Sequence, residues 1–242
     1  MLNKSCLALL LDGPMQSWGF TSRFTRRTTA LHPTKSAIVG LLAAAMRIDK
    51  NAPGEAPLIA RLAALKCTTI TLPKKHSGTE LPILRLIDYQ TIGGGYNKST
   101  QWMKKPRSAS GKTLETVLSQ RHYLLDARFG VLLKGDRDWL EEIANHLRNP
   151  AWGVWLGRKC CIPSSPLLVG IGCDNVEAWQ LLLKAASLDK DAPMTQFDHV
   201  IECEDNDCVD GEWLNDFPLA FGSPIGERHG PRRIREIKRI RI

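Results

Sequence analysis

The stretch Ser5-Cys-Leu-Ala-Leu-Leu-Leu-Asp-Gly-Pro-Met-Gln-Ser-Trp-Gly19 decides how this chain can begin to fold. Residues 6–11 are a continuous apolar run of strand length, and Asp12, Gly13 and Pro14 end it. An unbroken apolar run bounded by turn residues is typical of a buried strand. The chain is therefore predicted to start with a buried strand, followed by a loop in which aromatic and basic residues alternate.

Downstream, the pattern predicts alternating helices and strands. Thr34 or Ser36 can cap a helix rich in Ala and Leu, and Asp136 or Asp138 can start an amphipathic helix. We expect helices at residues 37–49, 57–65, 136–148 and 176–187, and strands at 66–72, 81–90 and 120–133. An extended segment is expected at 152–161.

This order of elements indicates an α+β protein. Strand, helix, two strands, helix and extended segment match the split β-α-β arrangement of a ferredoxin-like fold. We expect this domain to span residues 1–170, with a hairpin inserted at about 92–119. Residues 171–242 are expected to form a small, partly acidic β appendage. Its end alternates bases with isoleucines, which favours a final strand with one basic face; a disordered basic tail is the alternative.

The charge distribution points to a polyanionic partner. The formal net charge is +8, yet residues 174–216 carry twelve acids and two bases. The rest of the chain is therefore strongly basic, which suits a protein that touches nucleic acid with one side and protein or solvent with the other. A basic protein with one solvated acidic loop is the alternative interpretation.

Cysteine usage and hydropathy bear on where the protein works. Seven cysteines are an odd number, and Cys160 and Cys161 are adjacent, which suits no ordinary disulfide framework. The longest apolar helical stretch, residues 37–46, is too short to span a bilayer. We expect a cytoplasmic protein with reduced thiols and no contact with a membrane.

Residues 93–113 differ from their surroundings. Three glycines open the segment, which has no acidic residue and no apolar periodicity, so we expect it to project from the core. It holds two aromatic residues besides its bases, and the residues expected to contact RNA here are Lys98, Trp102, Lys104, Lys105 and Arg107.

A second group of candidate contacts lies between residues 13 and 36. Gln16 can hydrogen-bond a base edge, and Trp18 can stack on a base. A helix that begins at Thr34-Lys35-Ser36 offers free N–H groups to a phosphate. Trp18 as a core residue and Lys35 as a solvated one are the plain alternatives.

Five motifs in order resemble the Cas-five family of CRISPR-associated proteins. They are Gly13-Pro-Met-Gln-Ser-Trp-Gly19, Pro33-Thr-Lys-Ser36 before Val39-Gly-Leu-Leu42, Leu86-Ile-Asp-Tyr-Gln-Thr91, Arg121-His-Tyr-Leu-Leu-Asp-Ala-Arg-Phe129 and Leu156-Gly-Arg-Lys-Cys-Cys-Ile-Pro163. The likeness covers about residues 5–170 and is strongest to the type I-E branch. The family often has His where Gln90 stands.

This resemblance implies a modified RNA-recognition fold of the RAMP superfamily, with a β-hairpin thumb that would fall at the basic segment. It implies a non-catalytic Cascade subunit that holds the 5′ handle of the CRISPR RNA, contacts the backbone and large subunits, and serves DNA targeting indirectly. The handle site would include Gln16, Trp18, Arg23, Arg26, Arg27, Lys35 and Ser36 on one side and Arg158 and Lys159 on the other.

The alternative function is metal-independent cleavage of CRISPR repeat RNA, as in the type I-C branch of the family. Its nearest candidate groups here are His122 and Tyr123 with Lys112 or Arg121, acting as a general base and a cation at the phosphorane. No cofactor or metal is expected, because the chain lacks a P-loop, an EF-hand loop and zinc-knuckle spacing.

Overall fold

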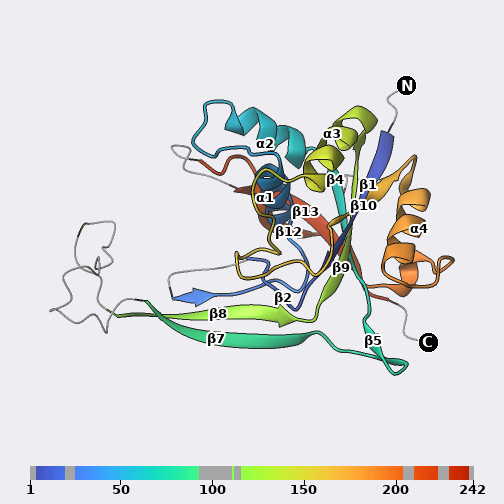
Figure 1. The fold of residues 1–242 in the computed structure, drawn as a ribbon, viewed down its shortest axis with the longest axis horizontal. Coiled ribbons are helices and arrows are strands. Elements are labelled where there is room, and N and C mark those ends of the chain that lie inside the picture. Colours follow the sequence, from blue (N-terminus) through green and yellow to red (C-terminus); the bar gives the residue numbers. More distant parts are fainter. Residues whose placement is uncertain are drawn as a thin grey trace.

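A computed structural model describes residues 4–19, 25–92, 111, 116–203, 210–222 and 229–239. The chain forms a large antiparallel sheet covered by helices and a smaller sheet from which a long hairpin extends (Figure 1). The large sheet has the strand order β10-β1-β9-β4-β11-β13-β12. The expected α+β class is confirmed.

The first four strands of the large sheet come from the N-terminal two thirds of the chain. They are β1 (Lys4–Asp12), β4 (Lys66–Thr71), β9 (Arg128–Asp136) and β10 (Leu168–Gly172). The last three strands, β11 (His199–Glu202), β12 (Glu212–Pro218) and β13 (His229–Ile237), continue the same sheet, because β11 pairs with β4. The expected appendage is thus an extension of this sheet, and the proposed boundary at residue 170 falls within β10.

Strand β1 lies at the centre of two hydrophobic cores. Leu7, Leu9 and Leu11 pack on one face, while Cys6, Ala8 and Leu10 pack on the other. The first face is covered by α1 (Lys35–Ala45), α2 (Glu55–Ala63) and α3 (Arg137–Arg148), the second by α4 (Asn175–Ala185) (Figure 1). Burial on both faces explains why the run of residues 6–11 has no polar alternation.

The smaller sheet, called the second sheet below, consists of four strands. They are β2 (Met15–Gln16), β3 (Arg26–Arg27), β7 (Leu84–Ile92) and β8 (Val117–Leu125). Strands β7 and β8 pair in register over nine residues and extend away from the large sheet (Figure 1). A two-stranded ribbon, β5 (Lys75–His76) with β6 (Thr79–Glu80), lies just before β7 in the chain.

The prediction of one strand at residues 120–133 was wrong in its continuity. β8 ends at Leu125 and β9 begins at Arg128, so the two strands belong to different sheets. Asp126 makes the break with a φ of 51°, and its N–H donates to the Pro14 carbonyl at 3.0 Å. Aspartate tolerates this left-handed conformation better than most residues do.

The expected extended segment at 152–161 has no strand, and β10 takes the edge of the sheet instead. Five cysteines are free thiols, whereas Cys203 is disulfide-bonded, contrary to the expectation of reduced thiols throughout. No helix in the described ranges is long and apolar enough to cross a membrane.

A buried ionic network joins the C-terminal strands to the start of α1. Asp216 on β12 accepts two hydrogen bonds from Arg232 on β13, at 2.8 and 2.6 Å. It also accepts the backbone N–H of Lys35 at 2.9 Å. Glu202 on β11 lies 2.7 Å from Lys35 Nζ and 3.2 Å from Arg232 Nη1. All four charges therefore have partners inside the protein.

The protonation of Asp216 is controlled by this network. Burial disfavours the charged carboxylate, but the hydrogen bonds and charge of Arg232 outweigh burial and lower the pKa of Asp216 below its ordinary value. Asp216 is therefore ionised at neutral pH.

We expect Asp216→Ala to lower the free energy of unfolding by about 3–5 kcal/mol, because it leaves Arg232 buried without its main partner. Urea denaturation at pH 7 measures this. The matched control is Glu141→Ala, which removes an exposed i,i+4 pair with Arg137 and should cost less than about 0.5 kcal/mol. Equal losses in the two variants would contradict the structural role of the network.

The same network predicts a pH dependence. Because the pKa of Asp216 is lower in the folded than in the unfolded protein, its contribution is present above about pH 4 and is lost as the pH falls through the folded-state pKa. The stability gap between the native chain and Asp216→Asn should narrow between pH 7 and pH 3. A gap that stays constant over this range would rule out the ionised carboxylate as its source.

Candidate functional site

Two of the sequence motifs meet beside the second sheet. The Ser17 N–H donates to the Leu156 carbonyl at 3.0 Å, which fastens the loop after β1 to the turn at residues 156–161. Gly157 sits in this turn with a φ of +97°, and a Cβ there would lie 1.8 Å from the Ser17 carbonyl oxygen. Only glycine fits so close to the neighbouring backbone. The Gly13–Gly19 motif and the Leu156–Pro163 motif thus form one unit.

Arg158 is held at the centre of this unit. One guanidinium nitrogen, Nη2, donates to the Arg27 carbonyl at 3.0 Å, and Cζ lies 4.8 Å from the centroid of the Tyr123 ring. Cys160 Sγ is 3.6 Å from the Tyr123 hydroxyl. The other terminal nitrogen, Arg158 Nη1, is buried and has no hydrogen-bond partner. The turn therefore presents a fixed guanidinium with a donor to spare.

Strand register brings two further arginines to the same face. Arg27 pairs with Arg121, and Arg121 is two residues from Tyr123 on β8, so all three side chains share one face of the second sheet. Arg121 Nε is also buried without a partner. We call Arg27, Arg121, Tyr123, Arg158 and the exposed Lys159 beside them the arginine face. Spare guanidinium donors around an aromatic ring suit a phosphate or a nucleic-acid backbone.

Arg26 is exposed but belongs to the opposite face. It pairs with Gln120, whose side chain alternates with that of Arg121. Asp88 lies across from Arg121 on β7 and accepts from the Gln90 side chain at 2.6 Å. Gln90 thus orients the carboxylate of Asp88, which by register shares the face of Arg121.

Gln16 and Trp18 are not at the surface, contrary to the expectation that they contact RNA. Both are 0% exposed. The Gln16 amide donates to the carbonyls of Leu11 and Ala127 and accepts from the Trp18 indole at 3.2 Å. Their polar atoms satisfy one another and the backbone. Both side chains therefore hold the loop onto the core. For Trp18 this is the alternative interpretation, that of a core residue.

The expected phosphate seat at the start of α1 is occupied by a carboxylate. Lys35 is 3% exposed and paired with Glu202, and Asp216 accepts its backbone N–H. Ser36 is half-buried, and its hydroxyl lies 3.4 Å from that of Thr34. The acidic residues that fill this position come from the 174–216 stretch, which was expected to face solvent or protein. Because these acidic residues lie far from Lys35 in the sequence, no local pattern indicated the contact.

The remaining expected RNA contacts and one alternative catalytic group lie outside the described residues. They are Arg23, Lys98, Trp102, Lys104, Lys105, Arg107 and Lys112. The sequence predicted Arg121 only as an alternative catalytic cation and not as a binding residue. Its position in the Arg121–Phe129 motif, beside His122 and Tyr123, could have indicated a role on the arginine face.

His122 and Tyr123, the alternative catalytic candidates, lie on opposite faces of the second sheet. They are successive residues of β8, so their side chains point to opposite faces. Tyr123 is 2% exposed, and burial raises the pKa of its phenol, which keeps it protonated. His122 Nε2 is buried without a hydrogen-bond partner. No group of three His, Cys, Asp or Glu side chains that could hold a metal occurs within the described ranges.

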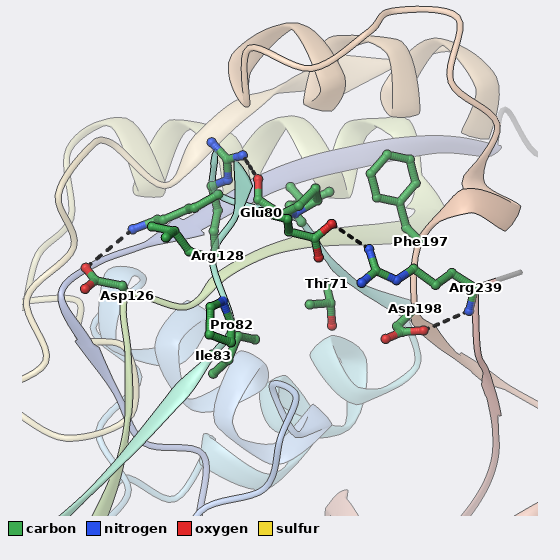
Figure 2. A pocket seen from close by; sticks show the side chains of 13 residues that line it. Thr71, Glu80, Pro82, Ile83, Asp126, Arg128, Phe197, Asp198 and Arg239 are labelled. Atoms are coloured by element: carbon green, nitrogen blue, oxygen red, sulfur yellow. Dashed lines mark hydrogen bonds and ion pairs between the residues drawn. The ribbon is translucent and has the colours of Figure 1, made fainter. Parts of the chain in front are cut away.

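A cavity near the base of the hairpin lies apart from the arginine face and is lined by paired charges. It has a volume of about 580 Å³ (Figure 2). The Arg239 guanidinium lies 2.8 Å from the Glu80 carboxylate, and the Arg239 backbone N–H donates to the Asp198 carboxylate. Lys74 lies 2.7 Å from Asp12 and 3.9 Å from Asp126. Because these charges neutralise one another, the arginine face is the better site for a polyanion.

Comparisons with known proteins agree with one another. The family described as CRISPR-associated protein (Cas5) matches residues 6–235. The Cascade subunit CasD of Escherichia coli (strain K12) is 28% identical over 177 residues, which cover 69% of this chain and 71% of that protein. A chain of a CRISPR RNA-guided surveillance complex is 28% identical, with a TM-score of 0.68 over 96% of this chain and 89% of its own. A Cas protein crystal structure is 26% identical, with a TM-score of 0.56 over 96% and 93% of the two chains.

We expect Gly157→Ala to destabilise the turn that holds Arg158. The new Cβ would collide with the Ser17 backbone and would sit at a positive φ, which costs at least about 1–3 kcal/mol of unfolding free energy. Urea denaturation measures the loss. Gly19→Ala in the adjoining motif is the control, because its Cβ meets no atom within 4 Å. A tolerated Gly157→Ala would show that the turn does not need glycine.

Proposed function

The chain belongs to the Cas5 family of CRISPR-associated proteins, and from that premise we propose that it is a Cascade subunit that binds the 5′ handle of the CRISPR RNA through its arginine face. The observation that carries the proposal is the fixed Arg158, stacked near Tyr123 with a buried donor that lacks a partner. The exposed side chains of Arg27 and Lys159 beside Arg158 would donate charge-assisted hydrogen bonds to an RNA phosphate and favour binding.

The fold supports this assignment. In the order β10-β1-β9-β4, helices α1 and α2 connect β1 to β4, and α3 lies between β9 and β10 in the chain. A split β-α-β arrangement of this kind is that of ferredoxin-like domains, to which RNA-recognition and RAMP domains belong. We propose a division close to the expected one, with residues 1–172, which include all of β10, in such a domain and the residues after them in a C-terminal region that lengthens its sheet.

We propose that the β7–β8 hairpin carries the thumb. Its described strands lead to residues 93–113, a segment with a strongly basic sequence and no acidic residue. Leu84, Ile87 and Tyr89 on β7 are 57%, 58% and 59% exposed. Apolar side chains on a projecting strand suit burial against a neighbouring subunit or against bases. The backbone and large subunits of the complex are the proposed protein partners, and contact with target DNA is indirect.

We further propose that the chain acts without catalysing RNA cleavage, in the cytoplasm where the complex meets its target. The geometry supports this, because His122 and Tyr123 face away from each other and Tyr123 is neutral and buried. A general base and its partner must reach the same phosphate and 2′-hydroxyl.

We expect Arg27→Ala with Arg158→Ala to weaken binding of handle RNA about tenfold or more at 0.1 M salt. Each lost phosphate contact should also reduce the slope of log affinity against log salt by about 0.7. Fluorescence anisotropy across a salt series measures both effects. The matched control is Arg148→Ala with Lys184→Ala, which removes equal charge from α3 and α4 and should leave binding unchanged. Equal affinities for the two double variants would refute the arginine face.

We expect the purified chain to leave labelled repeat RNA intact in the presence of a metal chelator. Gel analysis of the RNA after incubation provides the measurement. Cleavage by the native chain that disappears in His122→Ala would overturn the proposal of a non-catalytic subunit and favour the endoribonuclease alternative.

A further inference from the structure

The large sheet presents a second basic surface, on the face that α4 covers only in part. α4 packs against β1, β9 and β10. On the same face, strands β4, β11, β13 and β12 extend past it; Ile70 and His199 are buried there, whereas Lys66, Trp213, Arg233 and Arg235 are exposed or half-buried. This surface is independent of the second sheet and of the arginine face.

Strand register identifies the residues on this surface. Lys66 lies directly across from Lys134, and Trp213 lies directly across from Arg233. Arg235 lies across from Ile201. The alternation of β13 sends Arg233 and Arg235 to this face, while Arg232 and Ile234 are buried on the face of α1. We call Lys66, Lys134, Trp213, Arg233 and Arg235 the outer face.

The outer face combines positive charge with an exposed aromatic ring. Trp213 is 64% exposed on the edge strand β12. Lys134 is exposed, and Arg235 Nε is buried without a hydrogen-bond partner. In the order of the large sheet, β9 and β12 are separated by four steps from one strand to the next. The outer face is therefore roughly 19 Å wide, at about 4.8 Å per step. The described acids of β11, β12 and β13 alternate to the opposite face; they are Glu202, Glu212, Asp216 and Glu236.

We propose that the outer face binds a single-stranded nucleic acid, with Lys134 and Arg235 on its phosphates and Trp213 stacked on a base. The choice of partner rests on charge complementarity and on the flat sheet surface, where a base can stack as it does on other nucleic-acid platforms. An acidic protein segment would match the charges but would leave the tryptophan without a planar partner. The proposal does not depend on which RNA the arginine face holds.

The test uses the full chain carrying Arg27→Ala and Arg158→Ala, so that the arginine face no longer dominates binding. Fluorescence anisotropy with labelled dT20 and U20 is measured before and after adding Lys134→Gln and Arg235→Gln. We expect the added changes to weaken binding about tenfold and to reduce the salt slope by about 1.4, since two contacts are lost. Trp213→Ala should weaken binding about fivefold or more, and Trp213→Phe should restore most of it.

The matched control adds Lys184→Gln and Lys190→Gln, which remove the same charge from α4 and from the segment after it, and should change neither affinity nor slope. Urea denaturation of each variant checks that the sheet is intact. Stronger binding of U20 than of dT20 would identify RNA as the natural strand, and the reverse would identify DNA; either supports the proposal.

Three results would overturn it. The first is equal binding by the outer-face and control variants, and the second is an unchanged affinity in Trp213→Ala. The third concerns the acidic residues 204–207, which connect β11 to β12. If the oligonucleotides bind only after Glu204→Gln, Asp205→Asn and Asp207→Asn, the chain's own acidic segment occupies the outer face and the proposal fails.

Discussion

The buried contact between Asp216 and Arg232, with Lys35 and Glu202 around it, is the constraint on which the rest of the structure depends. A buried charge pair costs several kcal/mol of desolvation, which is recovered only when every donor and acceptor is matched. Here the carboxylate of Asp216 meets both the guanidinium of Arg232 and the first backbone N–H of α1. The start of α1 therefore has one position relative to β12 and β13, and the C-terminal strands must join the large sheet.

That constraint determines which parts of the molecule remain available for binding. The helix start at Lys35 is closed to a phosphate, because Asp216 already occupies it. The apolar strand β1 is closed on both faces by its two cores. The second sheet remains open, as does the outer face, and the strands of the second sheet are held to the core through the loop after β1 and the Gly157 turn. The arginine face is therefore built on rigid supports, which binding sites need for pre-organisation.

The two basic surfaces have a common design. Each places guanidinium groups with buried, unpartnered nitrogens beside an aromatic ring: Arg158 and Arg121 near Tyr123, and Arg235 with Trp213. A nucleic acid suits both surfaces, because its phosphates accept from basic side chains, and a base can also stack on the exposed Trp213 ring. The family assignment explains the first surface through the CRISPR RNA. The second surface extends the same chemistry to a strand that remains to be identified.

The sequence alone determined several of the elements and indicated the family. The unbroken apolar run at residues 6–11, the capping Asp136 and the ordered motifs needed only local spacing, so they predicted a buried strand, the helix at Arg137–Arg148 and the resemblance to Cas-five proteins. Only the tertiary structure decided which polar residues are free to bind. Gln16 and Lys35 look like ligand contacts locally, but they have partners in Ala127, Glu202 and Asp216, which are more than a hundred residues away. Burial and ion pairing are properties of such distant contacts, and no local pattern encodes them.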